Sequence, residues 1–285
     1  MREIAPGVVF ESTYLSGNVG CVLTEEGAVL IDSPMLPKDA WHWLRQIASV
    51  TKQGVAVLIN TDYSVERVLG NCFFPPTTTI AHEAAWMEMQ RYDESFLTRY
   101  MNHHKHYQER IQSDLTRVRI VSPEVAMTAD MTVHKGDRVL RLVHAGGHTP
   151  ASILVHLPEE RILFAGNVVV TGEHPALDHG DTMAWLHALE MIRGMDDVDI
   201  IVPGHGEPCD PSATEVLTDY ITQIRERVHE YFANGYTRRE TVDKVKMEDF
   251  YQVPSEQRSM LERRIRGSVE RVYDEFKRGT AMRRR

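Results

Sequence analysis

The chain has 285 residues, 42% of them hydrophobic and 26% charged, and its formal net charge is -9. This composition is typical of a soluble globular protein, and the acidic balance argues against nonspecific nucleic-acid binding, which requires Lys and Arg contacts to phosphates. No stretch approaches about 18 consecutive apolar residues and the N-terminus has no apolar signal core, so we expect a cytoplasmic protein without a membrane partner. The three cysteines lie far apart, which supports neither a disulfide framework nor a cysteine metal site.

The first part of the chain predicts short strands followed by a helix. Glu25-Glu26-Gly27 separates the apolar runs 19–24 and 28–31, which is typical of a hairpin. Residues 37–50 place apolar side chains at helical spacing, and the apolar run 55–59 follows as a buried strand. Functional residues commonly lie where such strands end in loops.

The middle of the chain predicts a helical cover and then further strands. Residues 81–116 are polar and aromatic, and we expect them to form helices over the mouth of a pocket. The next predicted elements are strands at 139–144, 152–157 and 161–164, a helix at 181–191 and a strand at 199–202.

Helical periodicity dominates the C-terminal part. A predicted helix begins at Ala213 and ends at Asn234-Gly235, and another begins near Pro254-Ser255. We therefore place a domain boundary after residue 210, with an α/β domain at 1–210 and a helical appendage at 211–285 that packs on it.

The most informative segment, Asn60–Asn71, follows the predicted buried strand and reads N-T-D-Y-S-V-E-R-V-L-G-N. It resembles the N-T-H-x-H-x-D-H-x-x-G-N signature of the metallo-β-lactamase fold superfamily, whose three His and one Asp bind zinc or iron. Those four places hold Asp62, Ser64, Glu66 and Arg67 in this chain. The flanking residues that fit the signature are Asn60, Thr61, Gly70 and Asn71.

Four other segments resemble the same family in the same order. The first hairpin ends in Asp32, which matches a structural Asp near the site. Residues 145–150 and 201–206 contain His148 and His205, which match ligand histidines. Asn167 stands where the family has an Asp that bridges two metals. The resemblance implies an α/β fold, an αββα sandwich of two mixed sheets with helices outside, and residues 267–276 resemble the last helix of a bacterial subgroup of this family.

The resemblance implies two altered metal sites. Of the seven usual ligand positions, only His148 and His205 keep the family residue. The first site would consist of Asp62, Ser64 and His148, and the second of Glu66, Arg67 and His205. A catalytic zinc site normally has three protein ligands that donate through N, O or S, and neither set provides three.

Arg67 and Asn167 argue most strongly against a dinuclear metal centre. A guanidinium carries a permanent charge and has no lone pair for a metal, and a neutral amide cannot bridge two cations as a carboxylate does. We therefore expect no metal cofactor. We hypothesise that ion pairs and hydrogen bonds among Asp62, Glu66, Arg67 and Asn167 replace the metals.

Three alternatives remain open from the sequence. One divalent metal (Zn, Fe or Mn) held by Asp62, Glu66, His148 and His205 would use acceptable ligand types. Metal-free catalysis would use Asp62 or Glu66 as a general base and Arg67 as an oxyanion donor. The cluster at 102–106, with His103 and His106 on one helical face, offers replacement ligands, although a solvated helix explains it equally well.

These observations favour a protein that uses the former active-site pocket to bind or sense a small molecule. Its pocket would contain Asp32, Ser64, His148, Asn167 and His205. The alternative is a hydrolase of an ester, lactone or thioester with a mononuclear or rearranged metal site. The sequence specifies neither the ligand nor the oligomeric state.

Overall fold

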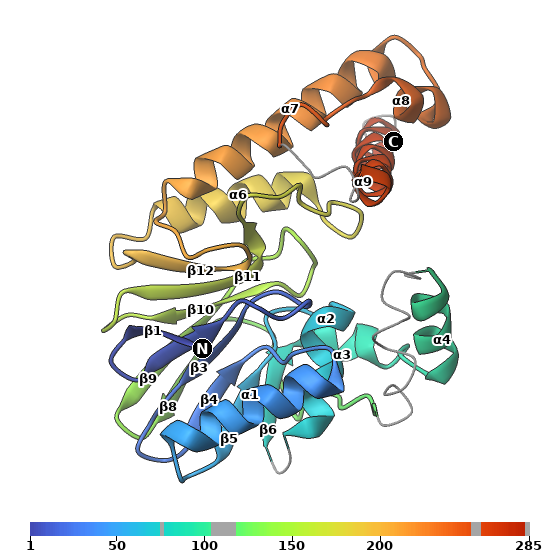
Figure 1. The fold of residues 1–285 in the computed structure, drawn as a ribbon. Helices are drawn as coiled ribbons and strands as arrows, with labels where there is room; N and C mark the ends of the chain where they lie inside the picture. Colours follow the sequence, from blue (N-terminus) through green and yellow to red (C-terminus); the bar gives the residue numbers. More distant parts are fainter. Residues whose placement is uncertain (75–76, 104–117, 252–257, 283–285) are drawn as a thin grey trace.

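The computed structural model describes residues 1–74, 77–103, 118–251 and 258–282. These residues form two β-sheets packed face to face, with helices on the two outer faces (Figure 1). This is the αββα sandwich that the resemblance implied, and the predicted fold class is therefore confirmed.

The first sheet contains seven strands in sequence order within the described residues. Its N-terminal strands pair antiparallel and its later strands, from β4 onward, pair parallel. The strands are β1 (Arg2–Ala5), β2 (Val8–Glu11), β3 (Val19–Val22), β4 (Ala28–Ile31), β5 (Val55–Ile59), β6 (Thr78–His82) and β7 (Val125–Met127).

The second sheet has the order β12-β11-β10-β9-β8, and only the β11–β12 pair is parallel. Its strands are β8 (Met131–Lys135), β9 (Arg138–His144), β10 (Ile153–Leu157), β11 (Ile162–Val170) and β12 (Ile200–His205).

Alternation along the strands creates the layers of the sandwich. In β4, Leu30 faces helix α1 (Pro37–Val50), whereas Ile31 faces the second sheet. In β11, Leu163 contributes to the cluster under the outer helices, whereas Phe164 lies between the sheets. Because successive side chains of a strand point to opposite faces, each sheet has apolar side chains on both faces. One face packs against the other sheet, and the opposite face packs against helices.

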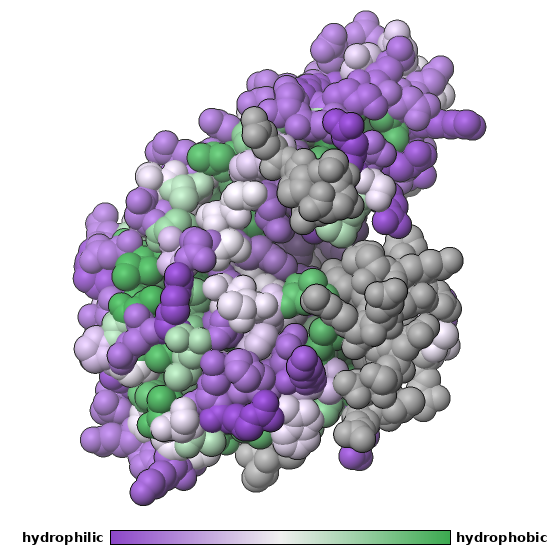
Figure 2. All heavy atoms as spheres, viewed as in Figure 1, coloured by the Kyte–Doolittle hydropathy of each residue, from purple (hydrophilic) through white to green (hydrophobic). Residues whose placement is uncertain are grey.

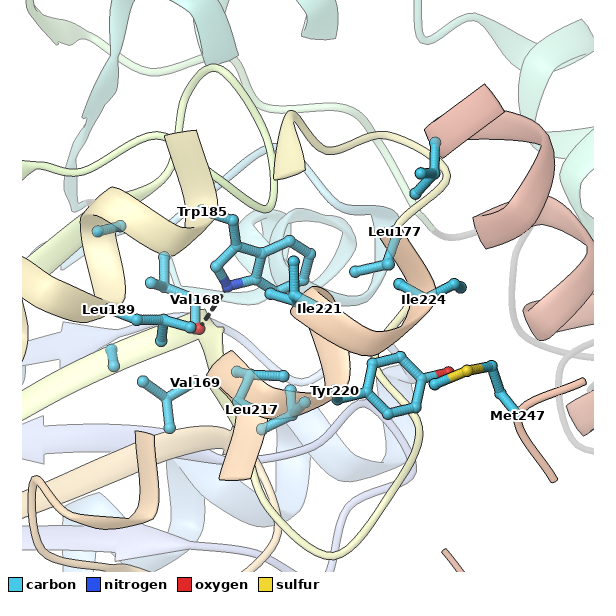
Figure 3. Packing of buried hydrophobic residues seen from close by; sticks show 14 of the residues in the cluster. Val168, Val169, Leu177, Trp185, Leu189, Leu217, Tyr220, Ile221, Ile224 and Met247 are labelled. Atoms are coloured by element: carbon cyan, nitrogen blue, oxygen red, sulfur yellow. Dashed lines mark hydrogen bonds between the residues drawn. The ribbon is translucent and has the colours of Figure 1, made fainter. Parts of the chain in front are cut away.

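Helices α6 (Thr182–Arg193) and α7 (Ala213–Ala233) cover the second sheet. Figure 3 shows their packing, in which the indole N–H of Trp185 donates to the carbonyl of Val168 at 2.8 Å. Helices α8 (Arg238–Lys244) and α9 (Arg258–Met282) pack against α7. The C-terminal helices thus share one apolar cluster with the second sheet, and the division at residue 210 stays a prediction.

A partly buried polar contact attaches α9 to the rest of the molecule. The Glu275 carboxylate accepts hydrogen bonds from the backbone N–H of Thr182 and from Arg225, each at 3.0 Å. Arg225 also forms an ion pair with this carboxylate, and both side chains are less than a fifth exposed. Around these helices the surface is mostly hydrophilic (Figure 2).

Several sequence-predicted elements match the structure, and others needed correction. The helix at 37–50 and the strand at 55–59 have the predicted bounds. The predicted strand 161–164 is β11, which continues to Val170 because the sequence after Asn167 is again apolar and β-branched. None of the helices in the described ranges has the length and apolar character needed to cross a bilayer.

The expected helical cover begins later than predicted. Residues 81 and 82 belong to β6, and helix α3 (Glu83–Met89) starts only after His82, whose side chain caps it by accepting from the Ala84 N–H. Helix α4 (Glu94–His103) follows, and residues 104–117 lie outside the described part of the chain.

Candidate functional site

The segment that follows β5 is held by an asparagine frame. The Asn60 side-chain N–H₂ donates to the backbone carbonyl of Arg67 at 3.0 Å, and the Ser33 hydroxyl donates to the same carbonyl at 3.0 Å. Asn71 donates to the side-chain oxygen of Asn60 at 2.8 Å. Helix α2 (Val65–Val68) is thereby fixed so that Arg67 points into the protein.

The Arg67 guanidinium is completely buried, with 0% exposure. Nη1 donates to the Asn18 carbonyl at 2.8 Å, and Nη2 donates to the Asn167 side-chain oxygen at 2.5 Å and to the Gly204 carbonyl at 2.9 Å. Its ion-pair partner is Asp32, with 3.8 Å between Nη1 and Oδ2. Two backbone carbonyls, one amide and one carboxylate therefore surround the charge.

Gly204 is required at this place for steric reasons. A Cβ atom on residue 204 would lie 2.4 Å from the Asn167 side-chain oxygen and 2.7 Å from Nη2 of Arg67. Both distances are shorter than van der Waals contact allows. The space that a side chain would fill is occupied by the guanidinium and its amide partner.

Asn18 is a site residue that the sequence did not single out. Its carbonyl accepts from Arg67, while its side-chain N–H₂ donates to the carbonyls of Pro203 and Gly206, each at 2.8 Å. The loop before β3 is thus joined to the end of β12. Its only sequence signal was its position at the start of the first hairpin.

Asp32 adopts a left-handed backbone conformation with φ 59°, which is uncommon for a residue other than glycine. Its carboxylate accepts from the backbone N–H of Thr61 at 2.8 Å and from the Thr61 hydroxyl at 2.7 Å. Burial raises the pKa of Asp32 to about 7, an effect that the charge of Asp62 increases and that Arg67 and the Thr61 bonds only partly offset.

Asn167 connects the arginine to the acidic residues. Its Oδ1 accepts from Arg67, and its Nδ2 donates to Asp62 at 3.3 Å and to Glu66 at 3.1 Å. The amide thus separates a cation on one side from two carboxylates on the other. A carboxylate at this position would have no hydrogen to donate to Asp62 and Glu66.

Two histidine–carboxylate pairs flank this amide. His205 lies 3.3 Å from Glu66 Oε1, and His148 lies 3.8 Å from Asp62 Oδ2. Burial tends to raise the pKa of Glu66, but the hydrogen bond from His205 and the charges of His205 and Arg67 outweigh it and hold that pKa well below its ordinary value. Burial lowers the pKa of His148, whose Nδ1 has no hydrogen-bond partner among the described residues.

The hypothesis about the replacement network needs one correction. We expected Arg67 to pair with Asp62 or Glu66, but its ion pair is with Asp32, because Asn167 stands between the guanidinium and the other two carboxylates. The oxyanion role proposed for Arg67 does not fit either, since its Nη1 and Nη2 donors face protein acceptors and its side chain is fully buried.

Other histidines lie apart from this network or outside the described residues. His144 stacks on His82 with 4.0 Å between ring centroids. His103 is the last residue of α4, and the predicted cluster partner His106 falls in the range 104–117, outside the described residues.

A cavity of about 680 Å³ opens above the buried network. Ser64, Glu66 and His148 contribute to its lining, whereas the buried Arg67 and Asn167 do not. Aromatic residues from the α3–α4 region form one part of the wall, and residues of α9 form another. Of the predicted pocket residues, Asp32 and His205 do not line the cavity either.

Comparison with known proteins gives the fold and a family match over part of the chain. The sequence profile of the metallo-beta-lactamase superfamily matches residues 75–205, a range that contains His148, Asn167 and His205 but not the altered segment 60–71. A metallo-beta-lactamase family protein from Thermus thermophilus superposes with a TM-score of 0.72, at 15% identity, over 98% of this chain and 95% of its own. This chain has the metallo-β-lactamase fold, and its residues 75–205 match the superfamily in sequence.

Two curated relatives match smaller parts of this chain. An acyl-coenzyme A thioesterase from Bos taurus is 38% identical over 93 residues, which is 31% of this chain and 33% of the relative. A linear primary-alkylsulfatase from Pseudomonas sp. is 27% identical over 122 residues, which is 38% of this chain and 22% of the relative. The matches thus span a third or less of each relative's length.

The residues present do not fit the dinuclear metal centre of the superfamily. Within the described ranges, no group of three or more His, Cys, Asp and Glu side chains is arranged to hold a metal ion. The acceptable donors form two separate pairs, with the neutral Asn167 amide between them and the Arg67 charge directly behind it. A divalent cation placed there would face electrostatic repulsion at short range.

Proposed function

We propose that this chain is a metal-independent member of the metallo-β-lactamase superfamily that binds a small molecule in the cavity above the former metal centre. One observation carries the proposal: the fully buried Arg67 guanidinium, bonded to Asn18, Asn167 and Gly204, replaces a metal-ligating histidine. Its fixed positive charge supplies the stabilisation of nearby carboxylates that metal ions provide in the superfamily.

The volume and lining of the cavity suit a small-molecule ligand of moderate size. Its volume of about 680 Å³ lies within the range of roughly 300–1,000 Å³ that small-molecule sites occupy. Aromatic side chains and a few charged groups line it, which is the usual composition of such sites. The pocket thus keeps the features needed for binding although the metal ligands are altered.

The second candidate is hydrolysis of an ester, lactone or thioester with one metal ion. It is favoured by the two pairs Glu66–His205 and Asp62–His148, which contain four acceptable ligands, and by the unpartnered Nδ1 of His148. The matched relatives are a thioesterase and an alkylsulfatase, both hydrolases by name. A mononuclear site would require these pairs to move together around a cation.

A variant that reverses the five altered positions tests the proposal. It combines Asp62→His, Ser64→His, Glu66→Asp, Arg67→His and Asn167→Asp. We expect the wild-type chain to show no thermal shift and no retained metal after incubation with Zn, Fe or Mn salts followed by desalting, and the folded variant to retain metal. Metal retained by the wild-type chain, and lost from a His148→Ala variant, would instead support the mononuclear hydrolase.

A further inference from the structure

The aromatic part of the cavity wall is an ordered stack. Tyr92 and Phe96 are parallel within 4°, with 4.2 Å between ring centroids, and Tyr100 continues the row at 6.3 Å from Phe96. The spacing of four residues places the three rings on one face of the α4 region. The Tyr92 hydroxyl donates to the Tyr63 carbonyl at 2.8 Å, which fixes the stack to the loop after β5. The wall therefore offers a continuous apolar surface.

The α9 part of the wall carries two guanidinium groups, Arg263 and Arg264. Arg264 pairs with Glu173 at 3.1 Å and donates to the His174 carbonyl at 2.7 Å. Arg263 donates through Nε to the Ser259 carbonyl of its own helix at 3.3 Å, and it has no ion pair with any residue that the structure describes. Among the described residues, its charge therefore has no carboxylate partner.

The acidic residues that line the cavity already have partners. Glu66 is bonded to His205 and Asn167, Glu88 pairs with Arg91 at 2.8 Å, and Asp178 lies 3.5 Å from His179. Aromatic rings and carboxylates together often bind organic cations. Here the carboxylates already have partners, which weakens the case for a cationic ligand. The Arg263 guanidinium favours an anionic ligand instead.

We propose that the cavity binds an amphipathic organic anion, with its carboxylate or sulfate on Arg263 and Arg264 and its apolar body on the stack Tyr92–Phe96–Tyr100. The inference rests on the proposed function, because it names the ligand class of that same pocket. Guanidinium groups bind carboxylate and sulfate oxygens through directed, charge-assisted hydrogen bonds. Planar rings bury an alkyl or aryl body with little loss of side-chain entropy.

The position of the two walls allows one ligand to reach both. Tyr92, Phe96 and Tyr100 belong to the α3–α4 region, whereas Arg263 and Arg264 belong to α9, so segments far apart in the sequence line one cavity. Helix α9 is fixed by the Glu275 contact with Arg225 and Thr182. Helix α9 thus forms one wall of the ligand pocket.

Titration calorimetry with probes of one chain length tests this inference. Decanoate and decyl sulfate supply the two anionic groups, and decyltrimethylammonium and decanol supply a cationic and a neutral head. We expect both anions to bind more tightly than the other two probes. The Arg263→Gln variant should lose about tenfold in affinity for the anions, and Arg263→Gln with Arg264→Gln more than either change alone. The matched control is Arg266→Gln, an exposed arginine of the same helix outside the cavity lining, which should bind as the wild type does.

A second variant separates the two walls. Phe96→Ala should weaken all four probes to a similar extent, because it removes apolar contact rather than charge. Tighter binding of decyltrimethylammonium than of the anions, or unchanged anion affinity in the arginine variants, would overturn the inference. Those outcomes leave the metal-independence of the chain untouched. Retained metal with intact, arginine-dependent anion binding would overturn the proposed function and leave the ligand class standing.

Discussion

Replacing Arg67 by methionine should destabilise the fold strongly while leaving its shape nearly unchanged. Methionine approximates the length of the arginine stem but removes the three hydrogen bonds to Asn18, Asn167 and Gly204, as well as the ion pair with Asp32. The oxygen atoms that accept these hydrogen bonds are buried. Each would lose a charge-assisted hydrogen bond and could not bond to water instead.

The magnitude follows from the geometry. Removing one partner of a buried ion pair typically costs about 3–5 kcal/mol, and the penalty is reduced because the guanidinium no longer has to be desolvated. Protonation of Asp32, whose pKa is already raised to about 7, further limits the loss. We therefore expect a decrease of about 3 kcal/mol in the free energy of unfolding, a large fraction of the roughly 5–15 kcal/mol that domains possess.

Urea unfolding followed by circular dichroism measures this decrease. Arg67→Lys serves as a second variant, since it keeps the charge but cannot supply donors in the fork geometry, and it should recover only part of the lost stability. Arg266→Gln, at an exposed arginine, should change the free energy by less than about 1 kcal/mol. A change of less than about 1 kcal/mol in the free energy of unfolding of Arg67→Met would be no larger than the loss of an exposed ion pair. That result would refute the assignment of Arg67 as the central cation.

Three further predictions concern the surroundings of the site. Gly204→Ala should lower the melting temperature, because the added Cβ would overlap the Asn167 amide and the Arg67 guanidinium. Gly279→Ala, at a helical position with open space, should be neutral or stabilising in the same thermal scan. The pKa of Asp32 is raised from 3.8 to about 7, so the folded state favours the protonated carboxyl. The stability of the wild type relative to Asp32→Asn should therefore fall as pH rises from about 4 to 7, by at most about 1.4 kcal/mol per pH unit. A rise in this relative stability, measured by urea unfolding, would mean that the fold favours the ionised carboxylate. Glu275→Ala should destabilise the chain by about 2–4 kcal/mol and weaken decyl sulfate binding, because it frees α9, while Asp274→Ala, at an exposed ion pair, should do neither.

The layers of the fold were readable from the sequence because local patterns and the global arrangement agree. Helix α1 and strand β5 were predicted with the bounds found, since the proline at the start and the apolar spacing are local signals. Helix α8 was missed although Thr237 and Glu240 form a capping box, a pattern that sequence inspection can detect.

The connections within the site were only partly predictable. The sequence identified Asp62, Glu66, Arg67 and Asn167 as a polar group but assigned the wrong ionic partner to Arg67. The choice of Asp32 depends on the direction of the side chain from α2, which the asparagine frame around its backbone determines. Such long-range geometry has no local sequence signal, and the same holds for the cavity that α9 and the aromatic stack line together.

Metal content is the most direct test of the central claim. The untagged chain, expressed in medium supplemented with zinc, iron and manganese and purified without chelators, would be examined by elemental analysis. The account predicts well under one equivalent of total transition metal per chain, because Arg67 and Asn167 occupy the place of two ligands. Near two equivalents, removable by chelation and accompanied by loss of stability, would contradict it.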